Sequence, residues 1–263
     1  MISSRWRTLS LVLATAGSLT AAEPSLKPEQ LASALQIESV TIPSPGEVFT
    51  AIDKAGRPNW IQFQREIKIG STDSREQIAL MLGTLVTDGY IAVEAQDWQS
   101  VKNTGKEIIN LAKKLNVSDN VLSRGNSLND FAENNEWNTL REELEATQNE
   151  VKLSMIDQKD DNLVILVTLG AWVRGIDLAS QIVEGAYTPE GAKVLHQPAI
   201  VAYLLKQLES LPQKTKDDPL VAELRAGLTH ILELVKPEVP TAENVKAIHE
   251  VAGLMVSKIM GNK

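Results

Sequence analysis

The sequence predicts an all-α protein made of antiparallel helical hairpins, and three observations support this fold class. Leu, Ala, Glu, Lys and Gln dominate the composition, and these residues favour helices. Aromatic residues make up only 4% of the 263 residues, which argues against aromatic-rich strands. Every break between apolar segments falls at a Pro, a Gly or a capping residue, and no segment alternates as a half-buried strand does.

We expect the hairpins to pack around a central apolar helix at about residues 161–184, with a solenoid-like stack as an alternative arrangement. Asp160 and Asp161 offer an N-cap and negative charge at its start. Residues 163–169 are apolar on every side of a helical wheel except at Thr168, which is typical of a surrounded helix. The following turns carry small residues, which allow another helix to approach closely, and two charges that need partners.

Residues 1–22 have the pattern of a signal peptide. Arg5 and Arg7 form a basic start, and residues 9–19 form a short, mostly apolar segment. Small residues at Thr20 to Ala22 match the positions that a signal peptidase reads, so we expect cleavage after Ala22. Eleven apolar-leaning residues are too few to span about 30 Å of hydrocarbon, which disfavours an uncleaved anchor.

Charge and cysteine content exclude several functional classes. The chain has no Cys, which excludes disulfides, thiolate metal sites and haem attached through cysteines. Without residues 1–22 the chain keeps 24 basic and 34 acidic residues, a formal charge of −10. This charge disfavours nucleic acid and anionic lipid as partners. Arg174 interrupts the longest apolar run, so we do not expect an integral membrane protein after signal cleavage.

Residues 23–70 are expected to form an N-terminal arm with short helices that packs on an all-helical domain at 71–263. Pro residues near the starts of segments 28–37 and 45–55 favour short helices there. A disordered linker is the alternative, but linkers are poor in aromatic residues. The side chains expected to hold the arm in place are apolar: Val48, Phe49, Trp60 and Phe63.

The remaining helices of the domain are delimited by caps and prolines. We expect Gly83 and Gly89 to interrupt the first of them. The expected segments are 75–96, 98–115, a single turn within 117–124, a short helix at 128–133, 137–156, 189–211 with a kink or restart at Pro198, 219–236 and 242–259.

Two internal similarities are visible. Leu82-Gly83 aligns with Leu169-Gly170 at an offset of 87 residues, and Asp97-Trp98 aligns with Glu136-Trp137 at an offset of 39. An acidic residue followed by Trp suits a helix cap and an anchoring ring. The two offsets are not multiples of one period, so we interpret them as a resemblance between amphipathic helices. Stacked hairpins of a solenoid are the alternative, and no family pattern is matched.

The residues needed for common catalytic and metal sites are missing or badly spaced. The three histidines, His196, His230 and His249, have no metal-ligand spacing. No Gly-x-Ser-x-Gly motif is present, and the run at 104–106 lacks the spacing of a phosphate loop. We therefore predict no catalytic residues, no metal and no cofactor.

One polar cluster remains as a candidate site, made of residues on the 75–96 segment and on the central helix: Asp88, Tyr90, Glu94, Trp172, Arg174 and Asp177. The interpretation that we favour is a buried ion pair between Arg174 and either Asp88 or Asp177, which fixes helix register. The alternative is a pocket in which Arg174 binds a carboxylate or phosphate between Trp172 and Tyr90.

These observations favour an exported, soluble, non-enzymatic protein of the periplasm or cell exterior. We expect it to bind an unknown protein partner or small ligand, or to serve a structural role. The alternative is a helical domain that binds small anions through Arg174, and an enzyme is the least favoured of the three classes.

Overall fold

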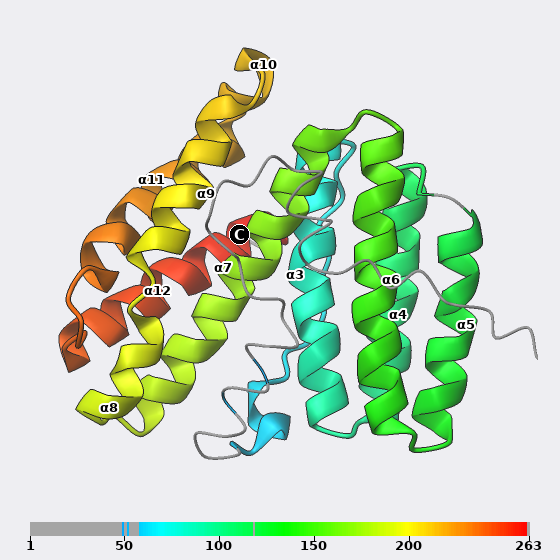
Figure 1. Cartoon of the computed structure of the whole chain (residues 1–263), viewed down its shortest axis with the longest axis horizontal. Helices are drawn as coiled ribbons and strands as arrows, with labels where there is room; N and C mark the ends of the chain where they lie inside the picture. Colours follow the sequence, from blue (N-terminus) through cyan, green and yellow to red (C-terminus); the bar gives the residue numbers. More distant parts are fainter. Residues whose placement is uncertain (1–48, 50–51, 53–57, 118, 262–263) are drawn as a thin grey trace, which may run out of the picture.

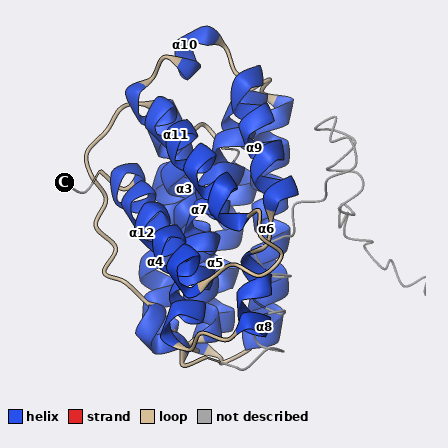
Figure 2. Cartoon of the chain, turned by 90° about the vertical axis from the view of Figure 1, so that its left-hand side faces the viewer, coloured by secondary structure: helices blue, strands red, loops and turns tan. Residues whose placement is uncertain are grey.

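The protein has an all-α fold, as the composition and helix boundaries predicted. The computed structural model describes Phe49, Ile52 and residues 58–117 and 119–261, and within them no strand is present (Figure 2). The elements are a 3-10 helix η1 (Trp60–Phe63), α3 (Arg75–Glu94), α4 (Trp98–Lys114), α5 (Asp119–Glu133), α6 (Trp137–Asp157), α7 (Asp161–Gly185), α8 (Pro189–Ala192), η2 (Lys193–Leu195), α9 (Pro198–Ser210), α10 (Gln213–Lys216), α11 (Pro219–Val235) and α12 (Ala242–Ile259).

The helices form two groups that meet along α3 and α7 (Figure 1). In the first group α3, α4, α5 and α6 lie side by side, and contact between α6 and α3 closes the group into a bundle. In the second group α12 packs on α7, α11 on α12, and α9 on α11. A solenoid would leave non-neighbouring helices such as α3 and α6 apart.

Four successive helix ends in the first group use the same turn, which makes each helix reverse into the next. The turn contains one residue with positive φ, and such a residue commonly ends a helix. The next backbone N–H then donates to the carbonyl five residues earlier, at Asp97, Val117, Glu136 and Asp160. The residues with positive φ are Gln96, Asn116, Asn135 and Lys159. The similarity at an offset of 39 residues thus coincides with a repeated turn.

The similarity at an offset of 87 residues marks the crossing of α3 and α7. A Cβ atom added at Gly83 would overlap the carbonyl oxygen of Val167, and one added at Gly170 would overlap that of Leu80. The two contacts are reciprocal, because 80 and 83 correspond to 167 and 170 at this offset. Glycine at both positions therefore allows the two backbones to touch.

Helix α7 lies between the two groups and is buried along most of its length. It is long and apolar enough to cross a membrane, but 83% of its most apolar window is buried inside the protein. Asp160 precedes it without a side-chain capping bond, contrary to the expected cap. The Asp160 carboxylate instead accepts a hydrogen bond from Arg75 at 2.8 Å.

Several sequence-based boundaries are corrected by the structure. Residues 119–133 form one helix rather than a turn and a separate short helix. Gly83 and Gly89 do not interrupt α3, because tertiary packing outweighs their poor helix propensity. Trp98 is 44% exposed and lies under Lys102, so it is not the anchoring ring that was expected.

Of the arm, the structure describes Phe49, Ile52 and residues 58–70, and the aromatic residues among them pack on α3. Phe49, Trp60 and Phe63 are buried, and the Phe49 ring stacks on Tyr90 with centroids 5.7 Å apart. Beyond η1 the chain reaches the end of α12, where the Gly70 N–H donates to the Met260 carbonyl at 2.8 Å. The predictions for residues 1–22, for the 28–37 helix and for Val48 lie outside the described residues. Of the helix predicted at 45–55 only Phe49 and Ile52 are described, and both are helical.

Candidate functional site

The structure joins Arg174, Asp88 and Asp177 in one buried ion network where α7 crosses α3. The Arg174 side chain is 3% exposed. Its Nε donates to Asp88 at 2.8 Å and its Nη1 to Asp177 at 2.6 Å. Its Nη2 donates to the backbone carbonyl of Phe63 at 3.0 Å. All three guanidinium nitrogens are therefore bonded to protein oxygens.

A second guanidinium, from Arg65, binds the other side of Asp88. Arg65 Nε donates to Asp88 Oδ2 at 2.9 Å, and Nη2 donates to the same oxygen at 2.6 Å. Arg65 follows η1 in a stretch with no helical periodicity, so sequence reasoning missed it. The network thus has two cations and two carboxylates, and it ties the arm to the α3–α7 crossing.

The pKa values in this network follow from burial and from the opposing charges. Burial alone would raise the pKa of Asp88, but Arg174, Arg65 and their hydrogen bonds together lower it. Burial alone would lower the pKa of Arg174, but Asp88 and Asp177 together raise it. Each charged form is therefore stabilised by its partners, as a structural ion network requires.

The other three predicted site residues lie outside this network. Tyr90 is two positions from Asp88 on α3, so it points away and packs on Phe49; burial raises the pKa of its hydroxyl. Glu94 binds Arg141 through two hydrogen bonds of 2.8 Å. Trp172 donates from Nε1 to Gln197 at 3.2 Å. The expected pocket walls, Tyr90 and Trp172, are thus not brought together around Arg174.

His249 and Glu184 adjoin the far end of the network. His249 Nδ1 lies 2.6 Å from Glu184, and Nε2 lies 3.9 Å from Asp177. Within the described ranges, no group of three or more His, Asp or Glu side chains is arranged to hold a metal ion. The residues here are suited to ion pairing between helices.

A polar groove lies beside the network, between the segment after η1 and helices α3 and α4. It has a volume of about 650 Å³ and is lined by Arg65, Asp88, Lys106 and Glu107 among others. Arg65 and Asp88 already satisfy each other. The remaining charges are of both signs, so the groove presents no single-sign surface for a charged ligand.

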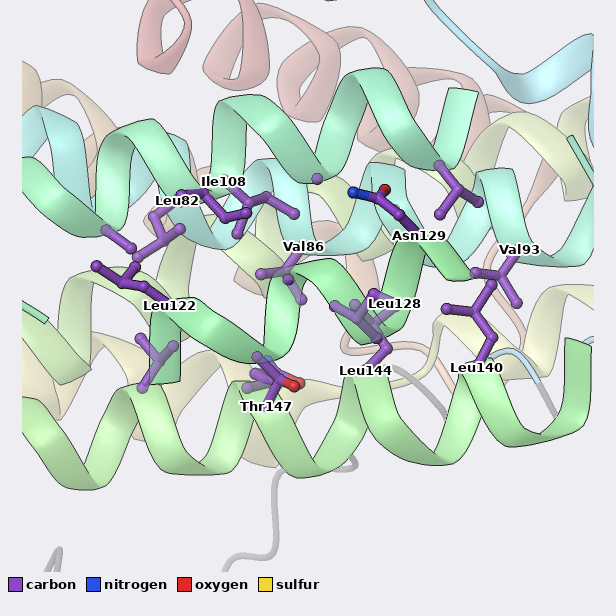
Figure 3. A pocket seen from close by; sticks show the side chains of 18 of the residues that line it. Leu82, Val86, Val93, Ile108, Leu122, Leu128, Asn129, Leu140, Leu144 and Thr147 are labelled. Carbon is purple, nitrogen blue, oxygen red and sulfur yellow. The ribbon is translucent and has the colours of Figure 1, made fainter. Parts of the chain in front are cut away.

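The strongest candidate site is a small apolar cavity inside the α3–α6 bundle. It has a volume of about 60 Å³, and side chains from α3, α4, α5 and α6 point toward one another around it (Figure 3). Its α3 lining extends from Leu82 to Val93, which is about 16 Å at the rise of an α-helix. Leu122 and Leu128 of α5 line it and are only half-buried, so solvent reaches this side.

Three glycines within helices line this cavity: Gly89, Gly105 and Gly125. A methyl group at Gly89 would meet side chains of Ile108, Thr104 and Leu144 at 3.8–3.9 Å, which is ordinary van der Waals contact. At Gly105 such a methyl would meet no described atom within 4 Å. No steric conflict therefore requires glycine at these two positions, although glycine within a helix costs about 1 kcal/mol relative to alanine.

Two polar side chains of α6 also line the cavity, and each leaves a buried polar atom that has no hydrogen-bond partner among the described residues. These atoms are Oγ1 of Thr147 and Nε2 of Gln148. Gln148 is only 5% exposed. An unsatisfied buried polar group costs about 1–3 kcal/mol, so such groups are rare unless something else binds them.

Signals for this site are present in the sequence, but the predicted polar cluster around Arg174 did not include them. Gln148 interrupts an apolar stripe of α6 in which Leu140, Leu144 and Val151 recur at helical spacing. Gly89 and Gly105 likewise fall on buried or partly buried faces of their helices. Only the packing of four helices shows that these positions surround one space.

Comparisons of the chain with protein-family models, with curated proteins and with solved structures found no match.

Proposed function

We propose that this chain is an exported, non-enzymatic binding protein whose α3–α6 bundle takes up a small apolar ligand. The observation that carries the proposal is Gly89, a buried glycine in the middle of α3 beside the cavity. Alanine would fit there at ordinary contact distances and would stabilise the helix. Keeping glycine leaves the space open at a cost in stability, which is expected where the space has a use.

The apolar lining supports the same proposal. Ligand sites in proteins are mostly apolar with a few polar groups that fix orientation. Here Val86, Leu140 and Leu144 provide apolar walls, and Thr147 and Gln148 provide the polar groups. Half-buried side chains on α5 mark the side from which a ligand reaches the cavity.

A methyl NMR titration of the full chain with xenon tests the proposal, because xenon is a single apolar atom that binds in dry apolar cavities. We expect shifts in the methyl signals of Val86 and Leu144, whereas Leu224 and Leu228, in the second group of helices, should not respond. Gly89→Ala should weaken binding about tenfold or more, because one extra carbon in an apolar site has an effect of that size. Absence of any response from Val86 and Leu144 would contradict the proposal.

Gly175→Ala is the matched control for this variant. Gly175 lies within α7, does not line the cavity, and has open space where a Cβ would be placed. The control substitution should therefore raise stability through helix propensity and leave xenon binding unchanged. Equal weakening by both variants would show that Gly89 has no special role in binding.

Small-anion binding through Arg174 is supported less well. A carboxylate or phosphate ligand needs free guanidinium nitrogens in an open pocket. Arg174 is 3% exposed, and Asp88, Asp177 and Phe63 accept its hydrogen bonds. An anion would have to displace these partners, so the ion network favours a structural role for Arg174.

Export is proposed from the pattern of residues 1–22. Mass spectrometry of the protein purified from its host should give a mature N-terminus at Glu23 or within a few residues of it. Recovery of protein that keeps Met1 in a cytosolic fraction would contradict export and would leave the cavity proposal untouched.

A further inference from the structure

We infer that the edge segment, residues 65–69, binds an extended peptide of a partner protein as an added β-strand in the polar groove beside α3 and α4. Three observations carry this inference: the extended course of the segment, the unpaired groups of its backbone, and the volume and lining of the groove. The groove and the bundle cavity share no lining residue, so the inference stands apart from the proposed cavity ligand.

The edge segment runs along α3 as an extended chain. At one end Arg65 binds Asp88 of α3, and at the other end Gly70 and Gln77 donate to adjacent carbonyls at the end of α12. Helix α3 rises about 16 Å between Gln77 and Asp88, at about 1.5 Å per residue. The five steps from Arg65 to Gly70 cover the same distance at about 3.3 Å per residue, which is the rise of a β-strand.

The side chains of the edge segment alternate between two faces, as those of a β-strand do. Arg65, Ile67 and Ile69 are partly buried. Glu66 and Lys68 are exposed and form an ion pair of 2.8 Å, because side chains two positions apart lie on the same face of an extended chain. The segment thus has the form of a single strand that packs on the protein through one face.

The backbone of the edge segment carries a row of hydrogen-bonding groups that are not paired. No N–H or C=O group of residues 65–69 has a partner among the described residues. An unpaired edge of this kind is a template for another extended chain, whose N–H and C=O groups recur at the same spacing. In peptide binding by strand addition, these backbone bonds give affinity and the alternate side chains give specificity.

The groove beside the edge segment has the volume and the lining for such a peptide. Its volume of about 650 Å³ lies within the range of about 300–1,000 Å³ that ligand pockets have. Ile67 and Ile69 of the edge segment and Ile91 of α3 supply apolar lining, and α4 supplies Ser100 and Asn103. The charges in the lining are of both signs, which favours a peptide with uncharged side chains. Apolar side chains at every second position of the peptide would face the isoleucines.

Two capped pentapeptides with the same side chains test the inference on the full chain. One is acetyl-Thr-Val-Thr-Val-Thr-amide, and in the other every backbone nitrogen of the five residues is methylated, so that it cannot donate. Binding is followed by NMR of the backbone amides, and the first peptide should shift the signals of residues 65–69 and Asn103. The methylated peptide should bind about tenfold or more weakly, because loss of two or more neutral hydrogen bonds has an effect of that size.

Amide hydrogen exchange shows whether the peptide binds as a strand. In the free chain the amides of residues 65–69 should exchange rapidly, since they have no partners. With the first peptide present every second amide should become protected, because successive N–H groups of a strand point to opposite edges. Protection in the free chain would mean that the chain itself or a second copy already covers the edge, and it would overturn the inference. Signal shifts without alternating protection would also overturn it.

Proline variants remove single N–H groups from the edge segment. Ile67→Pro and Lys68→Pro act on opposite edges, and Ile67→Ala and Lys68→Ala control for loss of the side chain. One proline variant should bind the first peptide about three- to tenfold more weakly than its alanine control, and the other should bind within about twofold of its control. Strand addition is contradicted if both proline variants bind like their controls, if the two peptides bind equally, or if the first peptide gives no response.

Discussion

Arg174 on α7 donates from Nε to Oδ1 of Asp88 on α3 at 2.8 Å, and both side chains are buried where the two helices cross. This pair is one link in a network, because Asp88 also binds Arg65 and Arg174 also binds Asp177. Each charge in the network has a partner of opposite sign. Removal of one charge should therefore lower the free energy of unfolding, because its partner then stays buried without an opposite charge.

Arg174→Met should lower the free energy of unfolding by about 3–5 kcal/mol, because it leaves Asp177 and part of Asp88 buried without a cation. Urea denaturation at pH 7 measures this change. Arg225→Ala is the matched control: its ion pair with Glu209 is exposed, so its loss should change stability by about 0–1 kcal/mol. Comparable stability of Arg174→Met and wild type would refute a structural role for the network.

Replacement of the buried members together should recover most of the lost stability. Arg174→Met combined with Asp88→Leu and Asp177→Leu removes every buried charge, and Arg65 is 23% exposed, so it can reach water. Apolar replacement of a complete buried ion network is often neutral or stabilising. The double variant of Arg174 and Asp88 should recover less, because Asp177 then stays buried without Arg174. A triple variant no more stable than Arg174→Met would contradict this account.

Acid should weaken the contribution of Asp88 in a defined direction. The pKa of Asp88 in the folded protein is lower than its ordinary value, because its ion pairs outweigh the effect of burial. The contribution is therefore complete above the ordinary Asp pKa of about 3.9 and is lost as pH falls through the folded pKa. The stability difference between wild type and Asp88→Asn should shrink as pH falls below about 4.

Urea denaturation across pH 2 to 7 checks this dependence. Asp73→Asn, at an exposed position, controls for the general effect of removing one negative charge. A difference between wild type and Asp88→Asn that stays constant down to pH 2 would show that Asp88 is not held ionised by its partners.

Glycine at the α3–α7 crossing should be indispensable, whereas glycine elsewhere in α7 should not. Gly83→Ala and Gly170→Ala each place a methyl group against a backbone carbonyl oxygen of the opposite helix. We expect each to lower the free energy of unfolding by about 1–3 kcal/mol through overpacking. Gly175→Ala should raise it by about 0.5–1 kcal/mol, since open space surrounds that position. Thermal unfolding followed by circular dichroism separates the two outcomes, and the same sign for all three would be evidence against close helix contact.

Gly89→Ala should stabilise the protein even though the position is buried. The methyl group gains helix propensity of about 1 kcal/mol and fills apolar space for about 0.8 kcal/mol more. We therefore expect the free energy of unfolding to rise by about 1–2 kcal/mol in the absence of ligand, measured by urea denaturation. A destabilised Gly89→Ala protein would mean that the space beside Gly89 is filled in solution, and the cavity would then be unsuited to a ligand.

The all-α class and most helix boundaries could be predicted from the sequence, because caps, prolines and helical periodicity act over a few residues. Asp97, Asp218 and Thr241 each cap the helix that follows them through side-chain bonds. The sequence also identified Asp88 and Asp177 as the candidate partners of Arg174. A charge on an otherwise apolar helix requires a partner, and only nearby acidic residues on facing or adjacent turns qualify.

Which distant residues share one space could be seen only after the helices were packed together. Arg65 joins Asp88 because the chain beyond η1 lies against α3, a contact that no local pattern encodes. Gly89, Gly105 and Gln148 come from three helices, and each looks like an ordinary weak point of its own helix in the sequence. They surround one cavity only because the same turn reverses the chain after α3, α4 and α5 and stacks these helices with α6. Helix formation depends on neighbouring residues, whereas a cavity depends on how several finished helices pack.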